Sequence, residues 1–241
     1  MTIPVIINGA NGRMGQEAVI AIENDTELEL VAALGRGDDL AKNIRDTKAK
    51  VVVDLTTPEV VYQNTKTIME NGASPVIGTS GFTPAQIEEL INLSKKEKIG
   101  GLIAPNFSIA AILTMRAAKM AAAYMPDVEI IEYHHNKKID APSGTALKTA
   151  ELINEARKQA PAELPNPNPN ARGHMHHDVP IHSLRLPGIV AKEDVIFGAP
   201  DETFTISHNS LHRKCFMPGI VFSCKKVVDL HELVYGLDNL L

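Results

Sequence analysis

Short apolar runs alternate with segments of helical spacing over the first 106 residues, and this alternation restricts the fold more than any other feature. Each run is rich in Val, Ile or Leu, as is typical of a strand buried on both faces. Pro58 and Thr83-Pro84 open two helical segments, and Asn71-Gly72 closes the first. The pattern predicts an α/β fold with a doubly wound parallel sheet. Its expected strands are Val5–Ile7, Leu28–Leu34, Val51–Leu55, Val76–Ile77 and Leu102–Ala104.

The pattern changes after residue 106, where strand-like runs follow one another with few helices between them. This favours an antiparallel or mixed sheet in a smaller α+β domain. We therefore expect a first domain at 1–106, a second at 107–213, and a C-terminal segment, 214–241, that packs back onto the first. The expected helices are Ile109–Tyr124, Thr145–Lys158, Gly219–Val228 and Asp229–Tyr235, and the expected strands are Val128–Tyr133, Ile181–Leu186, Asp194–Phe197 and Glu202–His208. A Pro- and Asn-rich loop is expected at 161–173.

Charge and composition exclude several classes of partner. The 24 Lys and Arg residues are outnumbered by 29 Asp and Glu, which gives a formal net charge of −5, and no basic stripe is present. Nucleic acid is therefore not an expected partner. No apolar run is long enough to cross a bilayer, and no basic and apolar leader precedes the first strand, so we expect no membrane partner and a cytoplasmic location.

A glycine-rich loop, Gly9-Ala10-Asn11-Gly12-Arg13-Met14-Gly15, directly follows the first strand. Glycines permit a tight turn and a close approach of backbone to a pyrophosphate, and the following helix offers unpaired N–H groups to phosphate. The spacing differs from the strict G-x-G-x-x-G, and a glycine turn without a ligand is the alternative. No Lys-Ser/Thr pair follows, which argues against a nucleotide triphosphate loop. The cation of Arg13 would meet phosphate or remain solvated.

The choice of dinucleotide is read at the end of the second strand, where an acid binds the ribose 2′-hydroxyl and an arginine favours a 2′-phosphate. The sequence there is Leu34-Gly35-Arg36, and Asp38 and Asp39 come a few residues later. This predicts NADPH ahead of NADH through Arg36. The alternative is a solvated Arg36 and binding of both cofactors.

The densest chemistry lies in the segment from Glu132 to Ala146. His134 and His135 end a strand and can exchange protons near neutral pH. Lys138 adds a positive charge and a proton. Ser143-Gly144-Thr145 then opens a helix whose N–H groups suit a carboxylate. Together these residues predict a site for a small anionic substrate that is protonated during reaction, although neighbouring strand residues face opposite sides unless the strand has already ended.

No metal site is predicted. Neither cysteine nor a third ligand stands at usable spacing from the His134-His135 pair, so zinc is disfavoured there. The separate histidines His174, His176 and His177 are interpreted as part of a solvated loop, with adventitious metal binding as the alternative.

Five motifs resemble those of the dihydrodipicolinate reductase family, and they run almost from end to end of the chain. The glycine loop resembles the family's G-A-x-G-R-M-G, and Glu132 to Ala146 matches its long E-x-H-H-x-x-K-x-D-A-P-S-G-T-A signature. The remaining matches are Asp54-Leu55-Thr56 with Pro58, Gly78-Thr79-Ser80-Gly81-Phe82, and Ala104-Pro105-Asn106-Phe107-Ser108.

The resemblance implies an activity and a division of roles. The activity is NAD(P)H-dependent reduction of 4-hydroxy-tetrahydrodipicolinate to tetrahydrodipicolinate, with loss of water, in lysine and diaminopimelate biosynthesis. It implies a Rossmann-type dinucleotide-binding first domain, and a second domain that binds the dicarboxylate substrate and assembles a homotetramer. His134 would be the acid/base histidine and Lys138 the proton donor, with His135, Ser143, Gly144 and Thr145 around the substrate. The cofactor would contact Gly9, Ala10, Asn11, Gly12, Arg13, Met14, Arg36, Gly78, Thr79, Ser80, Ala104, Pro105, Asn106 and Phe107.

Three departures from the family pattern qualify these roles. Gly35 stands where many members carry an acid, Ser80 replaces a threonine, and the stretch between the second and third strands is short. Two competing hypotheses remain: another small Rossmann dehydrogenase, and a dinucleotide-sensing protein without catalysis. The first has no need of the His-His-x-x-Lys and Ser-Gly-Thr pairing, and the second has no need of His134 and Lys138.

Overall fold

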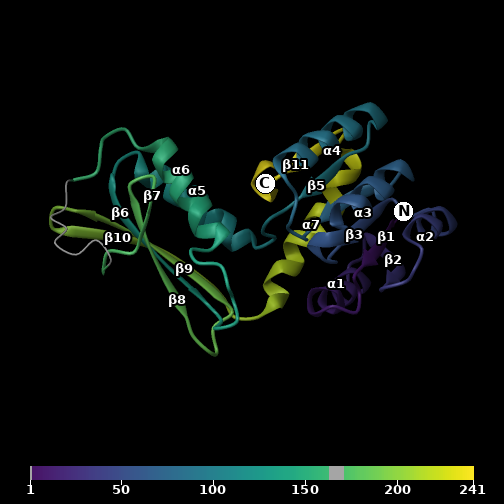
Figure 1. Ribbon diagram of the computed structural model, residues 1–241, viewed down its shortest axis with the longest axis horizontal. Coiled ribbons are helices and arrows are strands. Elements are labelled where there is room, and N and C mark those ends of the chain that lie inside the picture. Colours follow the sequence, from purple (N-terminus) through teal and green to yellow (C-terminus); the bar gives the residue numbers. More distant parts are fainter. Residues whose placement is uncertain (1, 163–170) are drawn as a thin grey trace. The chain divides into compact units, whose positions relative to one another are not determined.

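A computed structural model describes residues 2–162 and 171–241 and divides the chain into two compact units (Figure 1). The first unit comprises 1–108 and 216–241, and the second comprises 109–215. The boundaries expected from the sequence, at 106/107 and 213/214, lie two residues from these. Most of the Pro- and Asn-rich loop expected at 161–173 lies outside the described residues. Within the described ranges, no helix has the length and apolar character that crossing a bilayer requires.

The first unit is a six-stranded sheet of order β11-β5-β4-β3-β1-β2, in which every recorded pairing is parallel. The helices α2, α3 and α4 pack in succession on one face, and α1 packs with α7 on the other. This confirms the doubly wound α/β prediction. The elements are β1 Ile3–Asn8, α1 Arg13–Glu23, β2 Leu28–Leu34, α2 Leu40–Thr47, β3 Val51–Asp54, α3 Pro58–Glu70, β4 Ser74–Ile77, α4 Pro84–Glu97, β5 Gly101–Ile103, α7 Met217–Lys226 and β11 Leu233–Tyr235.

Two elements of this unit were not anticipated. The helix expected at Asp229–Tyr235 is wrong: a short 3-10 turn, Val227–Asp229, leads into β11, which adds to the sheet beside β5. Three residues are too few for periodicity to separate a strand from a helix. The helix α2 was not predicted, because it is only eight residues long and buries one side chain, Ile44, so its apolar pattern is short.

The second unit is a five-stranded mixed sheet of order β10-β9-β6-β8-β7. The β6–β8 pair is parallel and the other pairs are antiparallel, which confirms the expected mixed sheet. The helices α5 and α6 pack on each other and on one face of the sheet. The elements are α5 Ile109–Ala122, β6 Asp127–His134, α6 Gly144–Ala156, β7 His174–His176, β8 Val179–Arg185, β9 Ala191–Ala199 and β10 Glu202–Ser210.

The segment interpreted as a solvated histidine loop is a strand. His174–His176 forms β7, which pairs with β8 across the two-residue turn His177-Asp178. Both turn residues have positive φ, 49° and 57°, as a tight hairpin turn requires. The strand is short and lies at the sheet edge, so it lacks the alternating apolar pattern that would have revealed it.

Candidate functional site

The strand order of the first unit reverses at β1. From β1 the chain runs to β2 on one side and to β3, β4 and β5 on the other. Ligands of open parallel sheets bind where the strand order reverses in this way, beyond the carboxyl ends of the strands. The cofactor residues expected from the sequence all follow the carboxyl ends of β1, β2, β4 and β5, so the fold brings them to this edge.

The glycine loop between β1 and α1 leaves no room for a side chain at Gly9 or Gly15. A Cβ on Gly9, which has φ +89°, would lie 2.7 Å from the carbonyl oxygen of Leu55. A Cβ on Gly15 would lie 2.1 Å from the carbonyl oxygen of Gly9. Gly12 is the N-cap of α1, and no side chain of the described chain caps this helix. The first-turn N–H groups are therefore left to a ligand, and the loop fits a pyrophosphate.

A carboxylate reaches the end of β2 from farther along the chain than the sequence suggested. Asp38 Oδ2 accepts a hydrogen bond from the backbone N–H of Gly35 at 2.7 Å. Although Asp38 comes a few residues after the strand in the sequence, its carboxylate stands at the strand end, because the turn after β2 folds back on itself. Arg36 is exposed in the same turn. Both a negative and a positive group are thus available where a ribose would bind.

A buried carboxylate organises the middle of the crevice edge. Asp54, at the end of β3, is fully buried and accepts hydrogen bonds from Asn8 Nδ2 at 2.8 Å and Asn64 Nδ2 at 2.9 Å. Its other oxygen accepts from Thr56 Oγ1 at 2.6 Å and Thr79 Oγ1 at 3.3 Å. Asp54 therefore ties the turn after β4 to β1 and α3.

The turns after β4 and β5 lie against each other. A Cβ on Gly78 would lie 2.8 Å from both Leu55 Cδ2 and Phe107 Cε2. Ala104 N donates to the carbonyl of Ile77 at 2.9 Å, and Asn106 Oδ1 accepts from Ser108 N at 2.8 Å. Ala104 and Phe107 are buried, whereas Ser80 and Pro105 are exposed. The structure brings these predicted residues to one edge of the sheet.

In the second unit, His134 ends β6 and is held by a buried carboxylate. Glu132, two residues earlier on the same strand face, has a fully buried side chain, and its Oε2 lies 2.5 Å from His134 Nδ1. Arg185, opposite His134 on β8, donates to both oxygens of Glu132 at 2.9 and 2.7 Å. Burial alone would raise the pKa of Glu132, but the hydrogen bonds from His134 and Arg185 outweigh it and lower the pKa to about 2.

Lys138 joins the same network through Asp140. Its Nζ donates to Asp140 Oδ1 at 2.8 Å and Oδ2 at 2.6 Å, and the ion pair lowers the pKa of Asp140. Arg185 Nη2 donates to the backbone carbonyl of Asp140 at 2.6 Å. A chain of hydrogen bonds therefore links Lys138 to His134 by way of Asp140, Arg185 and Glu132.

The Ser143-Gly144-Thr145 turn has the geometry of an anion-binding helix start. The helix α6 begins at Gly144, and Ser143 Oγ accepts from Ala146 N at 3.2 Å. Ser143 is buried and its hydroxyl caps the helix, so its predicted contact with substrate remains a prediction. A Cβ on Gly144 would meet nothing within 4 Å, which leaves space above the helix end. Because β6 ends at His134, strand alternation no longer separates His135 from this site.

A second buried carboxyl lies behind the histidine. Glu193 on β9 stands opposite Glu132 in the sheet and accepts a hydrogen bond from Thr149 Oγ1 at 2.7 Å. Burial raises the pKa of Glu193 to about 7. Two carboxyl groups on neighbouring strands therefore have opposite shifts of their pKa values.

Three contributors to the site were not predicted as functional: Glu132, Asp140 and Arg185. Glu132 had a signal, since its spacing of two from His134 places both side chains on one face of a strand. Asp140 stood inside the signature but carried no assigned role. Arg185 had none, because its contact with Glu132 spans 53 residues and depends on the pairing of β6 with β8.

The sequence matches two family models that together cover most of the chain. Residues 3–107 match "Dihydrodipicolinate reductase, N-terminus" and residues 110–241 match "Dihydrodipicolinate reductase, C-terminus". Curated relatives named 4-hydroxy-tetrahydrodipicolinate reductase include one from Legionella pneumophila (strain Lens), 56% identical, and one from Coxiella burnetii (strain Dugway 5J108-111), 52% identical. In both cases the alignment covers 100% of each chain.

Solved structures give the same picture at two levels of similarity. A dipicolinate-bound dihydrodipicolinate reductase from Paenisporosarcina sp. TG-14 is 43% identical, with a TM-score of 0.91 and 100% coverage of both chains. An amine dehydrogenase from Mycobacterium smegmatis is 13% identical, with a TM-score of 0.67, and covers 99% of this chain and 96% of its own. The second likeness shows a shared fold alone.

Proposed function

The chain belongs to the dihydrodipicolinate reductase family, and from this premise we propose that it reduces 4-hydroxy-tetrahydrodipicolinate to tetrahydrodipicolinate in lysine and diaminopimelate biosynthesis. The substrate, a reduced nicotinamide dinucleotide and one proton are consumed, and the oxidised dinucleotide and water are released. The observation that carries this assignment is the network that joins His134 and Lys138 through Glu132, Arg185 and Asp140. Such a network has no use in a protein that only senses a dinucleotide.

The first unit would hold the cofactor, which supplies the hydride when bound. Support comes from the glycine loop, where the spaces at Gly9 and Gly15 exclude a Cβ and the start of α1 is uncapped. The pyrophosphate would take the N–H groups of this helix start. The turns at Gly78–Ser80 and Ala104–Phe107 would form the remainder of the cofactor site.

The second unit would bind the dicarboxylate and supply the proton. The N–H groups at the start of α6 and the imidazole of His135 would hold the substrate carboxylates. Lys138 would deliver a proton to the ring, and His134 would support it as an acid/base group whose charged form Glu132 stabilises. Glu132 and Arg185 are positioning residues in this scheme.

We further propose that NADPH is preferred and NADH is accepted. Arg36 would meet a 2′-phosphate, whereas Asp38, which is held on the Gly35 N–H, would meet the 2′-hydroxyl of NADH. In Asp38→Asn, kcat/KM for NADH should fall several-fold relative to that for NADPH. Arg36→Ala should have the opposite effect. If neither variant changes the ratio, the assignment of these two residues is wrong.

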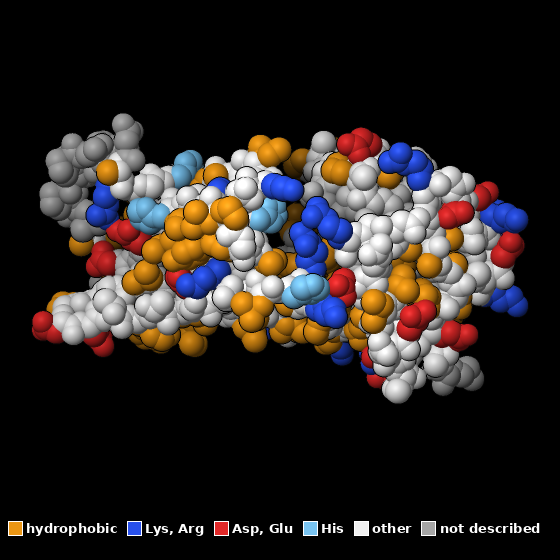
Figure 2. All heavy atoms as spheres, turned by 90° about the horizontal axis from the view of Figure 1, so that it is seen from below, with side chains coloured by type: hydrophobic (Ala, Val, Ile, Leu, Met, Phe, Trp, Pro, Cys, Tyr) orange, Lys and Arg blue, Asp and Glu red, His pale blue; other side chains and the backbone are white. Residues whose placement is uncertain are grey.

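The open face of the second sheet supports assembly into a homotetramer. Residues on the face of β6 turned away from α5 and α6 are only half-buried, and Figure 2, seen from below the view of Figure 1, shows hydrophobic side chains gathered on this part of the surface. Ile131, Ile196 and Met175 line a hollow there, together with Glu129 and His182. Light scattering should give four times the 26.1 kDa chain mass, and Ile131→Lys should lower that mass.

We place this activity in the cytoplasm. Both cysteines, Cys215 and Cys224, are free, which suits a reducing compartment.

The deciding experiment measures NADPH and NADH oxidation with substrate generated in place from pyruvate and aspartate semialdehyde by the preceding synthase. Oxidation that depends on the synthase would support the assignment. A folded protein that binds NADPH but oxidises neither cofactor would contradict it.

A further inference from the structure

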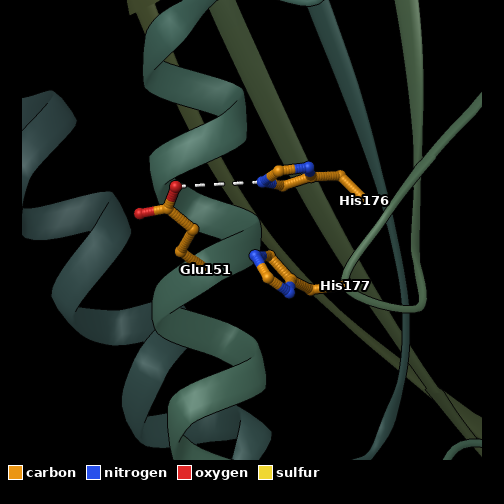
Figure 3. A group of neighbouring side chains, drawn as sticks. All are labelled: Glu151, His176 and His177. Carbon is orange, nitrogen blue, oxygen red and sulfur yellow. Dashed lines mark ion pairs between the residues drawn. The ribbon is translucent and has the colours of Figure 1, made fainter.

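Three side chains outside the site described above converge at the edge of the second unit. Glu151 projects from the middle of α6, and His176 and His177 come from the end of β7 and the turn that follows (Figure 3). One ligand atom of each residue lies within 4.8 Å of the other two. Glu151 Oε1 is 3.8 Å from His176 Nε2, and the two imidazole rings meet edge to face with centroids 4.4 Å apart.

This spacing is close to that of a metal site. Zinc binds histidine nitrogen and carboxylate oxygen at roughly 2.0–2.2 Å in tetrahedral geometry, so its ligand atoms lie about 3.4 Å apart. Small side-chain rotations would bring the three atoms to this spacing. Glu151 belongs to α6, and the two histidines belong to the β7–β8 hairpin, which already packs beside α6. No backbone movement is therefore required.

Neighbouring residues hold the ligands in place. The turn residues His177 and Asp178 have positive φ, and Arg157 Nη1 donates to their backbone carbonyls at 3.4 and 3.2 Å. Lys148 Nζ donates to Glu151 Oε2 at 3.2 Å, which leaves Oε1 facing His176. The Arg157 contacts therefore fix the backbone of the turn, and the Lys148 contact restricts the side chain of Glu151.

His176 provides the observation that points to a ligand. Its Nε2 is buried, yet within the described ranges it makes no hydrogen bond, and the Glu151 oxygen at 3.8 Å is too distant for one. A buried polar atom without a partner is costly, and a bound cation would satisfy it. The donor set of two imidazoles and one carboxylate, with the Lys148 cation beside it, disfavours Mg²⁺ and Ca²⁺, which prefer oxygen ligands.

We propose that Glu151, His176 and His177 bind one divalent transition-metal ion of the zinc type per chain. The three protein ligands leave a fourth position for water. The ion would tie α6 to the β7–β8 hairpin, and the inference does not depend on the proposed reductase activity. It takes up, for His176 and His177, the alternative of metal binding that the sequence left open.

The test uses protein without a histidine tag, treated with chelator and then titrated calorimetrically with ZnCl₂, and with CoCl₂ for its visible spectrum. We expect one Zn²⁺ per chain and an intense tetrahedral Co²⁺ band. His177→Asn, which tolerates positive φ, and Glu151→Gln should each weaken binding by at least about 100-fold, the upper end of what loss of an outer-shell partner typically costs. His174→Asn, on the same strand but outside the cluster, is the matched control and should bind as the wild type does.

Circular dichroism and the rate of NADPH oxidation are measured for all three variants. Both should equal those of the wild type, which would show that the variants fold. Absence of stoichiometric Zn²⁺ binding by the wild type would overturn the proposal. So would equal weakening in His174→Asn and His177→Asn, which would indicate adventitious binding to surface histidines.

Discussion

Replacing Glu132 with glutamine tests how the second unit controls its histidine. The change keeps the size of the side chain and removes a charge that contacts His134 Nδ1 at 2.5 Å and Arg185 at 2.7 and 2.9 Å. It therefore leaves the guanidinium of Arg185 without its buried partner. An amide facing His134 Nδ1 can also donate a hydrogen bond, which would favour the opposite tautomer of the ring.

The magnitude follows from the pKa of Glu132. The drop from 4.5 to about 2 means that the surroundings favour the charged carboxylate by about 3 kcal/mol, since each unit corresponds to about 1.36 kcal/mol. His134 and Arg185 share this energy. If about half of this energy holds His134 in its catalytic orientation, kcat should fall on the order of 10-fold. The pH–rate profile should also change, because the carboxylate that contacts His134 Nδ1 is lost.

The assay is steady-state oxidation of NADPH with coupled substrate, measured across pH, with NADPH affinity determined separately by fluorescence. Affinity for the cofactor should be unchanged, because the glycine loop belongs to the other unit. Glu155→Gln, an exposed glutamate on α6, is the matched control. An unchanged kcat with an unchanged pH profile in Glu132→Gln would refute the positioning role. Loss of NADPH affinity as well would indicate unfolding rather than lost positioning.

Three further predictions concern single residues. Lys138→Ala should lower kcat by at least about 100-fold while NADPH affinity, read by fluorescence, stays within two-fold, as expected for loss of a proton donor; an unchanged kcat would exclude that role. Gly15→Ala places a Cβ 2.1 Å from the carbonyl oxygen of Gly9, so NADPH affinity should fall at least about ten-fold, and normal affinity in calorimetry would show that the loop does not hold the pyrophosphate. Glu193→Gln should be more stable than the wild type at pH 8, by no more than about 3 kcal/mol in urea unfolding, and nearly equal to it at pH 5. The sign follows because burial raises the pKa of Glu193 from 4.5 to about 7, so the contribution of Glu193 to stability is complete below pH 4.5 and is lost as pH rises through 7; an equal difference at both pH values would contradict this.

Local patterns predicted most of the first unit. Buried strands such as Val51–Asp54 contain consecutive apolar residues bounded by turns, and helices such as α4 carry a full capping box at Thr83 and Gln86. Both kinds of element can therefore be predicted from a few neighbouring residues. The strand β11 was missed because three residues carry no period, and its identity depends on pairing with β5. The helix α2 was missed because it buries one side chain.

The candidate site divides in the same way. The glycine loop and the segment from His134 to Thr145 were found because each is continuous in the sequence, and their roles toward cofactor and substrate remain predictions. The position of Asp38 was not predicted because its contact with Gly35 depends on how one turn folds back. Arg185 was missed because the parallel register of β6 and β8, which sets it opposite His134, is a property of the folded sheet.

The pairing of β6 with β9 explains why this site holds one negative charge and not two. Glu132 and Glu193 stand opposite each other on neighbouring strands, and both are nearly inaccessible, with exposures of 0% and 5%. Glu132 contacts the guanidinium of Arg185 and the imidazole of His134, whereas Glu193 accepts a hydrogen bond from a hydroxyl. Burial therefore raises the pKa of Glu193 to about 7, and its carboxyl stays protonated below that pH. A second charge would repel the first across the sheet and weaken the hold of Glu132 on His134. The neutral carboxyl of Glu193 thus leaves Glu132 free to hold His134 and Arg185 without a competing charge on the next strand.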